Sequence, residues 1–71
     1  CRIAINHRNI KNMIGQFTAL LAKDNVNIDD MTNKSRGSYA YTMIDVDNDV
    51  AEDVVKGLEM IEGVLKVRVI A

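Results

Sequence analysis

Residues 6–15 carry the densest set of side chains that could bind a small ligand. They include the chain's single histidine, His7, and three asparagines, Asn6, Asn9 and Asn12. Imidazole and side-chain amides both donate and accept hydrogen bonds, and backbone amides at a helix start attract anions. The stretch follows a hydrophobic strand pattern and precedes an amphipathic one, so it is typical of a cradle for a small zwitterion. A polar loop with an asparagine cap is the alternative.

The other polar residues form no recognisable enzyme site. No Ser or Cys accompanies His7 in a nucleophile motif, and one His with one Cys is too few for zinc. No GxGxxG or P-loop occurs. The aspartates of residues 45–49 are spaced like the start of a calcium loop, but Val50 stands where glycine is needed and Lys56 where glutamate is needed. We expect no catalytic residue, metal site or cofactor site in this chain.

Residues 36–41 resemble the RNA-recognition signature, a strand with spaced aromatics. The pattern departs from it, because Ser38 is inserted after the glycine and Ala4 occupies the first-strand position of a second stacking ring. The net charge is -1 and the pI is near 5.7. A surface that follows phosphates needs a basic excess, so we expect no nucleic-acid partner.

Length and composition indicate one small domain spanning residues 1–71. A single Cys excludes an internal disulfide and gives no sign of an oxidising compartment. No apolar run approaches the roughly 20 residues of a membrane span, so we expect no membrane partner. A strand pattern begins at Cys1. We interpret the chain as a domain of a longer, cytoplasmic protein.

The first half of the chain predicts strand, helix and strand. Period-two alternation over residues 1–5 predicts a half-buried strand. A helix to about Asp24 follows, with Asn12 as its side-chain N-cap and Asn25 as a left-handed terminator. Its apolar stripe comprises Met13, Ile14, Phe17, Leu20 and Leu21. An increasingly polar strand over residues 26–35 suits a sheet edge or contact with another chain.

The second half predicts strand, helix and strand again. A turn over residues 36–38 leads to a strand over 39–47, with one face comprising Ala40, Thr42, Ile44 and Val46 and the other Tyr39, Tyr41 and Met43. Asp49 and Glu52 have the form of a capping box. The buried stripe of that helix comprises Val50, Val54, Leu58 and Ile61.

Gly57 weakens the second helix, and a close approach of the helix to the sheet would explain it. A turn at Glu62-Gly63 leads to a last strand over 64–70, with Leu65, Val67 and Val69 facing inward. The order predicts an α+β class, the ferredoxin-like βαββαβ split sandwich. We expect a four-stranded antiparallel sheet of strand order four-one-three-two with both helices on one face.

Several segments together resemble the ACT domain at the C-terminus of D-3-phosphoglycerate dehydrogenase. These are residues 3–9, 12–15, 26–28, 33–37, 39–47 and 63–70. The resemblance covers the whole chain and implies the same split sandwich. It also implies a regulatory domain, without catalytic activity of its own, that binds L-serine for feedback control of an NAD-dependent parent enzyme.

The resemblance implies a ligand site shared by two copies that join through their second strands and first helices. By position, one copy supplies His7 and Asn9, and its partner supplies Asn27. The amides of Asn12, Met13 and Ile14 lie where a carboxylate would gain from the helix start. Where the common ACT loop has Pro-Gly, this chain has Lys11-Asn12, and Asn occupies some conformations that favour Gly.

Two other functions remain open on the sequence. The chain can be a dimerisation module that binds no amino acid, since its polar second strand suits pairing with its own copy. It can also be an ACT domain that senses another amino acid.

Overall fold

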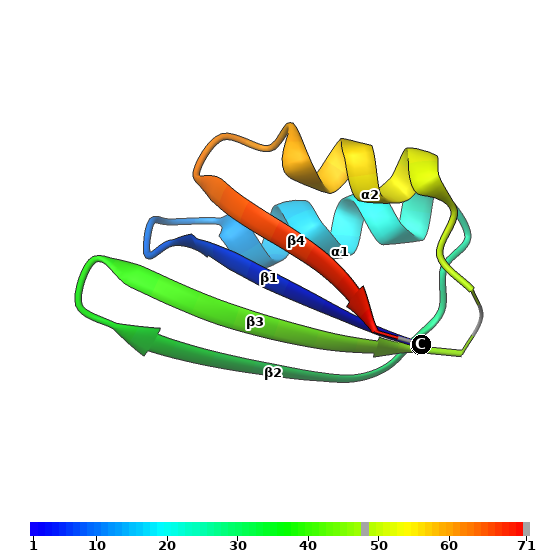
Figure 1. The fold of residues 1–71 in the computed structure, drawn as a ribbon, viewed down its shortest axis with the longest axis horizontal. Coiled ribbons are helices and arrows are strands. Elements are labelled where there is room, and N and C mark those ends of the chain that lie inside the picture. The colour runs from blue at the N-terminus through cyan, green and yellow to red at the C-terminus, as the bar shows by residue number, and fades with distance from the viewer. Residues whose placement is uncertain (48, 71) are drawn as a thin grey trace.

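The computed structural model describes residues 1–47 and 49–70. Six elements follow one another: β1 (Arg2–Arg8), α1 (Met13–Lys23), β2 (Ile28–Arg36), β3 (Tyr39–Val46), α2 (Glu52–Glu59) and β4 (Val64–Ile70). The strands form an antiparallel sheet in the order β2-β3-β1-β4, and both helices lie on one face of it (Figure 1). The predicted βαββαβ fold and strand order are confirmed.

The core lies between the helices and the sheet. From the helices come residues such as Phe17, Leu21 and Leu58, each with none of its surface exposed, and from the sheet come Ile3, Ile5 and Ile44. Phe17 and Leu21 are four residues apart and therefore share one face of α1. The other face of the sheet has no helix over it (Figure 1), so we call it the open face.

The two ends of α1 use left-handed asparagines. Asn12 has φ of 65° and Asn25 has φ of 59°. Asn25 ends the helix as predicted. Asn12 occupies the predicted N-cap position, but its side chain makes no cap hydrogen bond, so the predicted capping mechanism is wrong. The backbone carbonyl of Asn12 instead accepts from the Gln16 amide at 3.2 Å. Asn12 therefore supplies the left-handed conformation for which Gly is usually chosen.

A substitution by serine distinguishes the two roles of Asn12. Serine is a good side-chain cap but tolerates a positive φ poorly, at a cost of about 1 kcal/mol. We therefore expect Asn12→Ser to lower the free energy of unfolding by about that amount, and Asn12→Gly to leave it within about 0.5 kcal/mol. Urea unfolding followed by circular dichroism measures both. An Asn12→Ser variant as stable as the unsubstituted chain would restore the capping explanation.

The second helix departs from the prediction at its start and in its middle. The Asp49 capping box is wrong, since α2 begins at Glu52 after Ala51 and has no side-chain cap. A Cβ placed on Gly57 would lie 3.0 Å from Cδ1 of Leu20 in α1. The close approach at Gly57 is therefore between the two helices, not between helix and sheet as predicted. The aspartate run includes Asn48, which lies outside the described residues.

A bulge in β4 explains the remaining departure. Asn6 pairs with Lys66, but His7 pairs with Val64, so Leu65 is the extra residue. Leu65 is 57% exposed and Val69 is 42% exposed, whereas Val67 is buried as predicted. The inward placement of Leu65 is wrong because the bulge breaks the alternation. Val69 pairs with buried Ile3 and therefore lies on the core face as predicted. It is partly exposed because β4 is an edge strand of the sheet.

An ion pair joins the start of β1 to the end of β3. Arg2 Nε donates to Asp45 Oδ1 at 2.7 Å. The hydrogen bond from Arg2 lowers the pKa of Asp45, and the same bond raises the pKa of Arg2. Because the folded-state pKa of Asp45 is depressed, the pair stabilises the fold fully above the ordinary carboxyl value of 3.8. That stabilisation is lost as the pH falls from there through the lower folded-state pKa.

Removing the guanidinium tests this pair. We expect Arg2→Gln to raise the pKa of the Asp45 carboxyl toward 3.8, with only a small change in stability at neutral pH because the pair is exposed. NMR titration of the Asp45 side chain measures the shift. Lys56→Gln is the matched control and should leave the Asp45 titration unchanged.

Candidate functional site

The residues predicted to bind a ligand lie in four places in one chain. His7 lies in β1, Asn9 lies in the loop that follows it, and Asn12, Met13 and Ile14 lie at the start of α1. Asn27 precedes β2 at the opposite end of α1, and Figure 1 shows the two connections of α1 at opposite ends of the domain. One chain therefore does not bring Asn27 together with the others.

His7 is a buried core residue, with 2% of its surface exposed. Its ring meets Phe17 edge-on at a centroid distance of 5.1 Å. Nδ1 lies 2.9 Å from the Arg8 carbonyl oxygen and Nε2 lies 2.8 Å from Thr42 Oγ1. Both ring nitrogens therefore have partners within the chain.

The His7 contacts continue to the edge of the sheet. Thr42 Oγ1 also lies 3.2 Å from Asn33 Oδ1 on β2. A carbonyl oxygen only accepts, so Nδ1 of His7 carries a proton. Thr42 has one hydroxyl proton and gives it either to His7 or to Asn33. In the first case His7 is neutral and the Asn33 amide turns its nitrogen to Thr42. In the second case His7 is an imidazolium.

Thr42 and Asn33 were missed as partners of His7 in the sequence. The signal was present, because Thr42 is the polar member of a row that otherwise comprises Ala40, Ile44 and Val46. A buried hydroxyl requires a partner. The identity of that partner depends on the strand register, which pairs His7 with Ala40 and Asn33 with Thr42. The register cannot be deduced from the sequence.

The loop after β1 is held by two turns. The Asn9 amide donates to the Ser38 carbonyl at 2.8 Å, and Asn9 Nδ2 donates to the Gly37 carbonyl at 3.1 Å. The Arg8 amide donates to the Gly63 carbonyl at 2.8 Å. These bonds fix the loop against the β2–β3 turn and the α2–β4 turn. Because the Asn9 bond uses the amide nitrogen, Oδ1 is the atom that can accept from a ligand.

The start of α1 offers backbone amides rather than side chains. The bond from the Gln16 amide to the Asn12 carbonyl is the first of the helix. The amides of Met13 and Ile14 therefore precede the helical ladder and point out of its end. The Met13 side chain is buried in the core, and that of Ile14 packs partly against it.

Asn27 is held at the other end of α1. Its Nδ2 donates to Asp47 Oδ2 at 3.1 Å, and its carbonyl accepts from the Asp47 amide at 3.3 Å. As with Asn9, Oδ1 is the acceptor that can face a ligand. In one chain Asn27 and Asn9 belong to separate polar surfaces.

The described part of the chain has neither a cluster of metal-ligating side chains nor a helix that could span a membrane. Within residues 1–47 and 49–70, no three or more His, Cys, Asp or Glu side chains are grouped so as to hold a metal ion. The same residues form no helix with the length and hydropathy to cross a bilayer.

Solved structures share this fold. The ACT domain of GTP pyrophosphokinase from Chlorobium tepidum is similar over 94% of this chain and 91% of its own, with 23% identity and a TM-score of 0.66. The acetolactate synthase small subunit of Thermotoga maritima matches 94% of this chain with 20% identity and a TM-score of 0.78. The ligand-free regulatory subunit of aspartate kinase from Thermus thermophilus matches 94% of this chain, with 16% identity and a TM-score of 0.72.

The chain spans 44% of the acetolactate synthase subunit and 48% of the aspartate kinase subunit, but nearly all of the GTP pyrophosphokinase domain. No protein-family model matches the sequence, and no curated protein matches it significantly. Identities at this level establish a shared architecture. The chain therefore has the fold of an ACT domain.

Proposed function

We propose that this chain is an amino-acid-binding allosteric regulatory domain, without catalytic activity of its own. Its ligand is L-serine, bound between two copies that join through β2 and α1. The parent protein is a cytoplasmic D-3-phosphoglycerate dehydrogenase whose catalytic part, not this chain, binds NAD. The observation that carries the proposal is the ACT fold together with polar groups fixed at both ends of α1.

The polar groups suit the ammonium and the carboxylate of serine. Oδ1 of Asn9 and Oδ1 of Asn27 can accept from its ammonium. The amides of Met13 and Ile14 can donate to its carboxylate at the positive end of α1. Since Asn9 and Asn27 lie at opposite ends of α1 in one chain, a complete site requires a second copy in the antiparallel orientation of a twofold dimer.

The role of His7 is indirect in this proposal. Its bonds to Thr42 and to the Arg8 carbonyl hold the end of β1, from which the loop to Asn9 starts. A direct contact between His7 and serine requires the 2.8 Å bond to Thr42 to break. His7 is therefore a positioning residue, and the ligand contacts come from the two asparagines and the helix start.

Regulation follows from linkage. Serine that contacts both copies binds the paired arrangement more tightly than the separated one, and so shifts the population toward it. In the parent enzyme this shift biases the catalytic domains toward one state.

A thermal-shift titration tests ligand binding. A ligand at 100 times its Kd stabilises the folded state by about 2.7 kcal/mol, which raises Tm by roughly 10 °C or more in a domain of this size. We expect that response to millimolar L-serine and none to L-alanine. Glycine, threonine and phenylalanine complete the panel, and a response to one of them alone would assign another amino acid.

Mixing two variants tests whether the site is shared. We expect Asn9→Ala and Asn27→Ala each to abolish serine binding, while Asn6→Ala leaves it unchanged. In an equal mixture, random dimers restore about one quarter of the sites, which calorimetric stoichiometry measures. Failure of the mixture to restore any binding would show that both asparagines act within one chain, or that neither contacts serine.

A dimerisation module without ligand is the second candidate. Eight of the nine residues of β2 are exposed and the strand lies at the sheet edge, so it can pair with another β2. Sedimentation velocity would then show a dimer at all serine concentrations, and no amino acid of the panel would raise Tm.

A further inference from the structure

The open face of the sheet has an ordered pattern of rings and cations. Residues paired across neighbouring strands share a face. One row across the sheet is Arg36, Tyr39 and Arg8, and the next is Lys34, Tyr41, Asn6 and Lys66. Each tyrosine therefore lies between cationic or amide side chains on both sides, and neither row contains a carboxylate.

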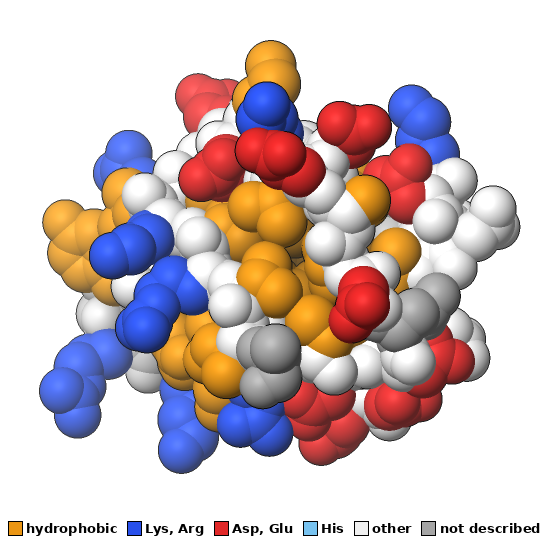
Figure 2. All heavy atoms as spheres, turned by 45° about the vertical axis from the view of Figure 1, so that its right-hand side comes forward, with side chains coloured by type: hydrophobic (Ala, Val, Ile, Leu, Met, Phe, Trp, Pro, Cys, Tyr) orange, Lys and Arg blue, Asp and Glu red, His pale blue; other side chains and the backbone are white. Residues whose placement is uncertain are grey.

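Charge is segregated between the open face and the rest of the chain. Six of the nine Lys and Arg residues lie on the open face by register: Arg2, Arg8, Lys34, Arg36, Lys66 and Arg68. Of the ten acidic residues, Asp30 and Asp45 share that face by register, in the row farthest from the tyrosines. α2 and the turn after it carry Glu52, Asp53, Glu59 and Glu62. In Figure 2 most Lys and Arg side chains gather at the left and lower left, while Asp and Glu side chains dominate the top and the right.

The cations near the tyrosines are available to a ligand. Within residues 1–47 and 49–70, the ion pairs are Arg2 with Asp45 and Lys56 with Glu52. Arg8, Lys34, Arg36 and Lys66 are all exposed. None of these four side chains is in an ion pair within the described residues, so a polyanion can bind all four.

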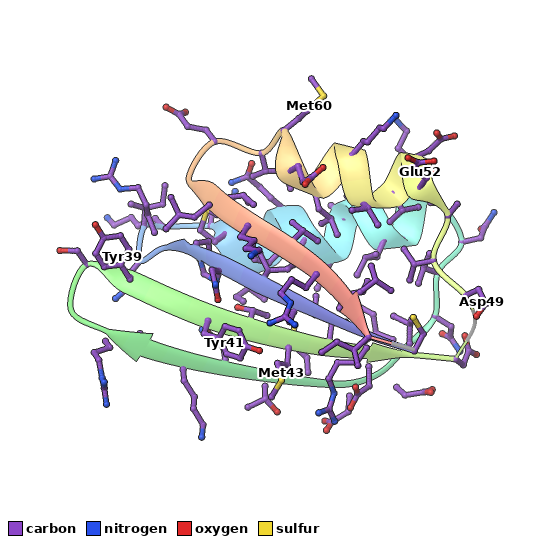
Figure 3. All side chains as sticks on the ribbon, in the orientation of Figure 1. Tyr39, Tyr41, Met43, Asp49, Glu52 and Met60 are labelled. Atoms are coloured by element: carbon purple, nitrogen blue, oxygen red, sulfur yellow. The ribbon has the colours of Figure 1, made fainter. Side chains whose placement is uncertain are left out.

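The tyrosines present their rings to solvent. Tyr39 is 59% exposed and Tyr41 is 38% exposed, and Figure 3 shows both on β3, with Met43 next along the strand. Together with Leu65 and Asn6 they line a shallow concavity of about 580 Å³. Tyr39 and Tyr41 are two residues apart on one face, hence about 7 Å apart along the strand.

We propose that the open face binds single-stranded nucleic acid, with bases stacked on Tyr39 and Tyr41 and phosphates held by Arg8, Lys34, Arg36 and Lys66. A four-stranded sheet with exposed aromatics binds single strands by stacking, and a cationic surface tracks the backbone. In a duplex the faces of the bases are stacked on one another, so the rings of Tyr39 and Tyr41 would have no base to stack on. A second copy docked sheet to sheet would oppose cation to cation. The proposed serine contacts, Asn9, Asn27 and the α1 amides, are not used, so this site and that one succeed or fail separately.

Fluorescence anisotropy with a labelled 12-nucleotide single-stranded RNA tests the electrostatic part. Each phosphate contact contributes about 0.7 to the slope of log K against log salt for single strands. We expect Lys34→Gln/Lys66→Gln to weaken binding and to reduce the slope by about 1.4. Lys23→Gln/Lys56→Gln is the matched control, since it removes the same charge from the helices, and should change neither.

The tyrosines test stacking. Stacking contributes about 1–3 kcal/mol per base, so we expect Tyr39→Leu/Tyr41→Leu to weaken RNA binding at least tenfold. The same variant should bind polyphosphate, which has no bases, as the unsubstituted chain does. Circular dichroism confirms that the exposed substitutions leave the fold intact.

Four outcomes would overturn the proposal. The first is no RNA binding at low salt. The second is that the open-face variant and the helix variant weaken RNA binding equally, which would show that only the total charge of the chain matters. The third is RNA binding that survives loss of both tyrosines. The fourth is tighter binding of poly-L-glutamate than of RNA, which would make the open face a docking surface for an acidic protein segment.

Discussion

Phe17→Ala is expected to leave the folded chain with about 0–2 kcal/mol of stability at 25 °C. Phe17 has none of its surface exposed, and its ring contacts the edge-on ring of His7. Truncating a buried Phe costs about 3–5 kcal/mol, partly through the cavity that remains. A domain of this length has a stability near the low end of about 5–15 kcal/mol, so the loss is comparable to the total. Urea unfolding followed by circular dichroism should show a much lower midpoint with an unchanged slope.

Two variants make that result specific to core packing. Phe17→Leu keeps an apolar side chain and should cost markedly less, about 1–2 kcal/mol. Tyr39→Leu removes a ring of similar size from the open face and should stay within about 0.5 kcal/mol of the unsubstituted chain. If Phe17→Ala were as stable as Tyr39→Leu, the helices would have to close onto the sheet without Phe17, and the described core would be wrong.

The fold was predictable because its periodic segments agree with one another. Helical spacing in α1 identified Phe17 and Leu21 as one apolar stripe, and alternation in β3 placed Ile44 and Val46 on one face. All four are buried. Six elements in that order admit few topologies under the rules of handedness and hairpin connection. The role of Asn25 as a left-handed helix terminator was predictable from the residue alone, since few residues other than Gly accept a positive φ.

The errors fall where a distant partner decides a local feature. The capping box at Asp49 was a valid local pattern, but Ala51 has an extended backbone and α2 starts after it. The inward placement of Leu65 assumed unbroken alternation, and the bulge opposite His7 breaks it. Gly57 was assigned to the sheet because the position of Leu20 on the other helix depends on how the two helices pack.

Charge and burial at the candidate sites were also set by pairing. The net charge of -1 is the sum of a cationic open face and an acidic remainder of the chain, and only the strand register separates them. His7 was predicted to lie in a loop, yet β1 extends to Arg8 and carries it into the core. A single histidine after a short strand gives no local signal of that extension.

His7→Leu is expected to destabilise the fold by about 1–3 kcal/mol, although leucine fills much of the ring's volume. The change removes the 2.8 Å bond between Nε2 and the buried Thr42 hydroxyl, which keeps its 3.2 Å bond to Asn33 Oδ1. The loss of one such bond costs about 0.5–1.5 kcal/mol. It also removes the edge-on contact with Phe17, worth about 0.5–1.5 kcal/mol beyond its buried area. Chemical denaturation measures the loss.

A double-mutant cycle isolates the His7–Thr42 bond. Thr42→Val leaves Nε2 of His7 unsatisfied, whereas His7→Leu/Thr42→Val removes both partners together. The double variant should therefore be more stable than the sum of the two single losses predicts, by about 1–3 kcal/mol. Additive losses would show that the bond contributes nothing and that only volume matters at this position.

The same variants separate a structural His7 from a ligand-binding one. If His7 acts by holding the end of β1, any loss of serine response in His7→Leu should accompany the loss of stability, and conditions that restore folding should restore the response. Asn9→Ala, at an exposed position, should remove the response while leaving stability within about 0.5 kcal/mol. A His7→Leu chain that folds normally yet does not respond to serine would mean that the ring turns from Thr42 to the ligand. The bond to Thr42 would then be an unliganded state of the site rather than part of the core.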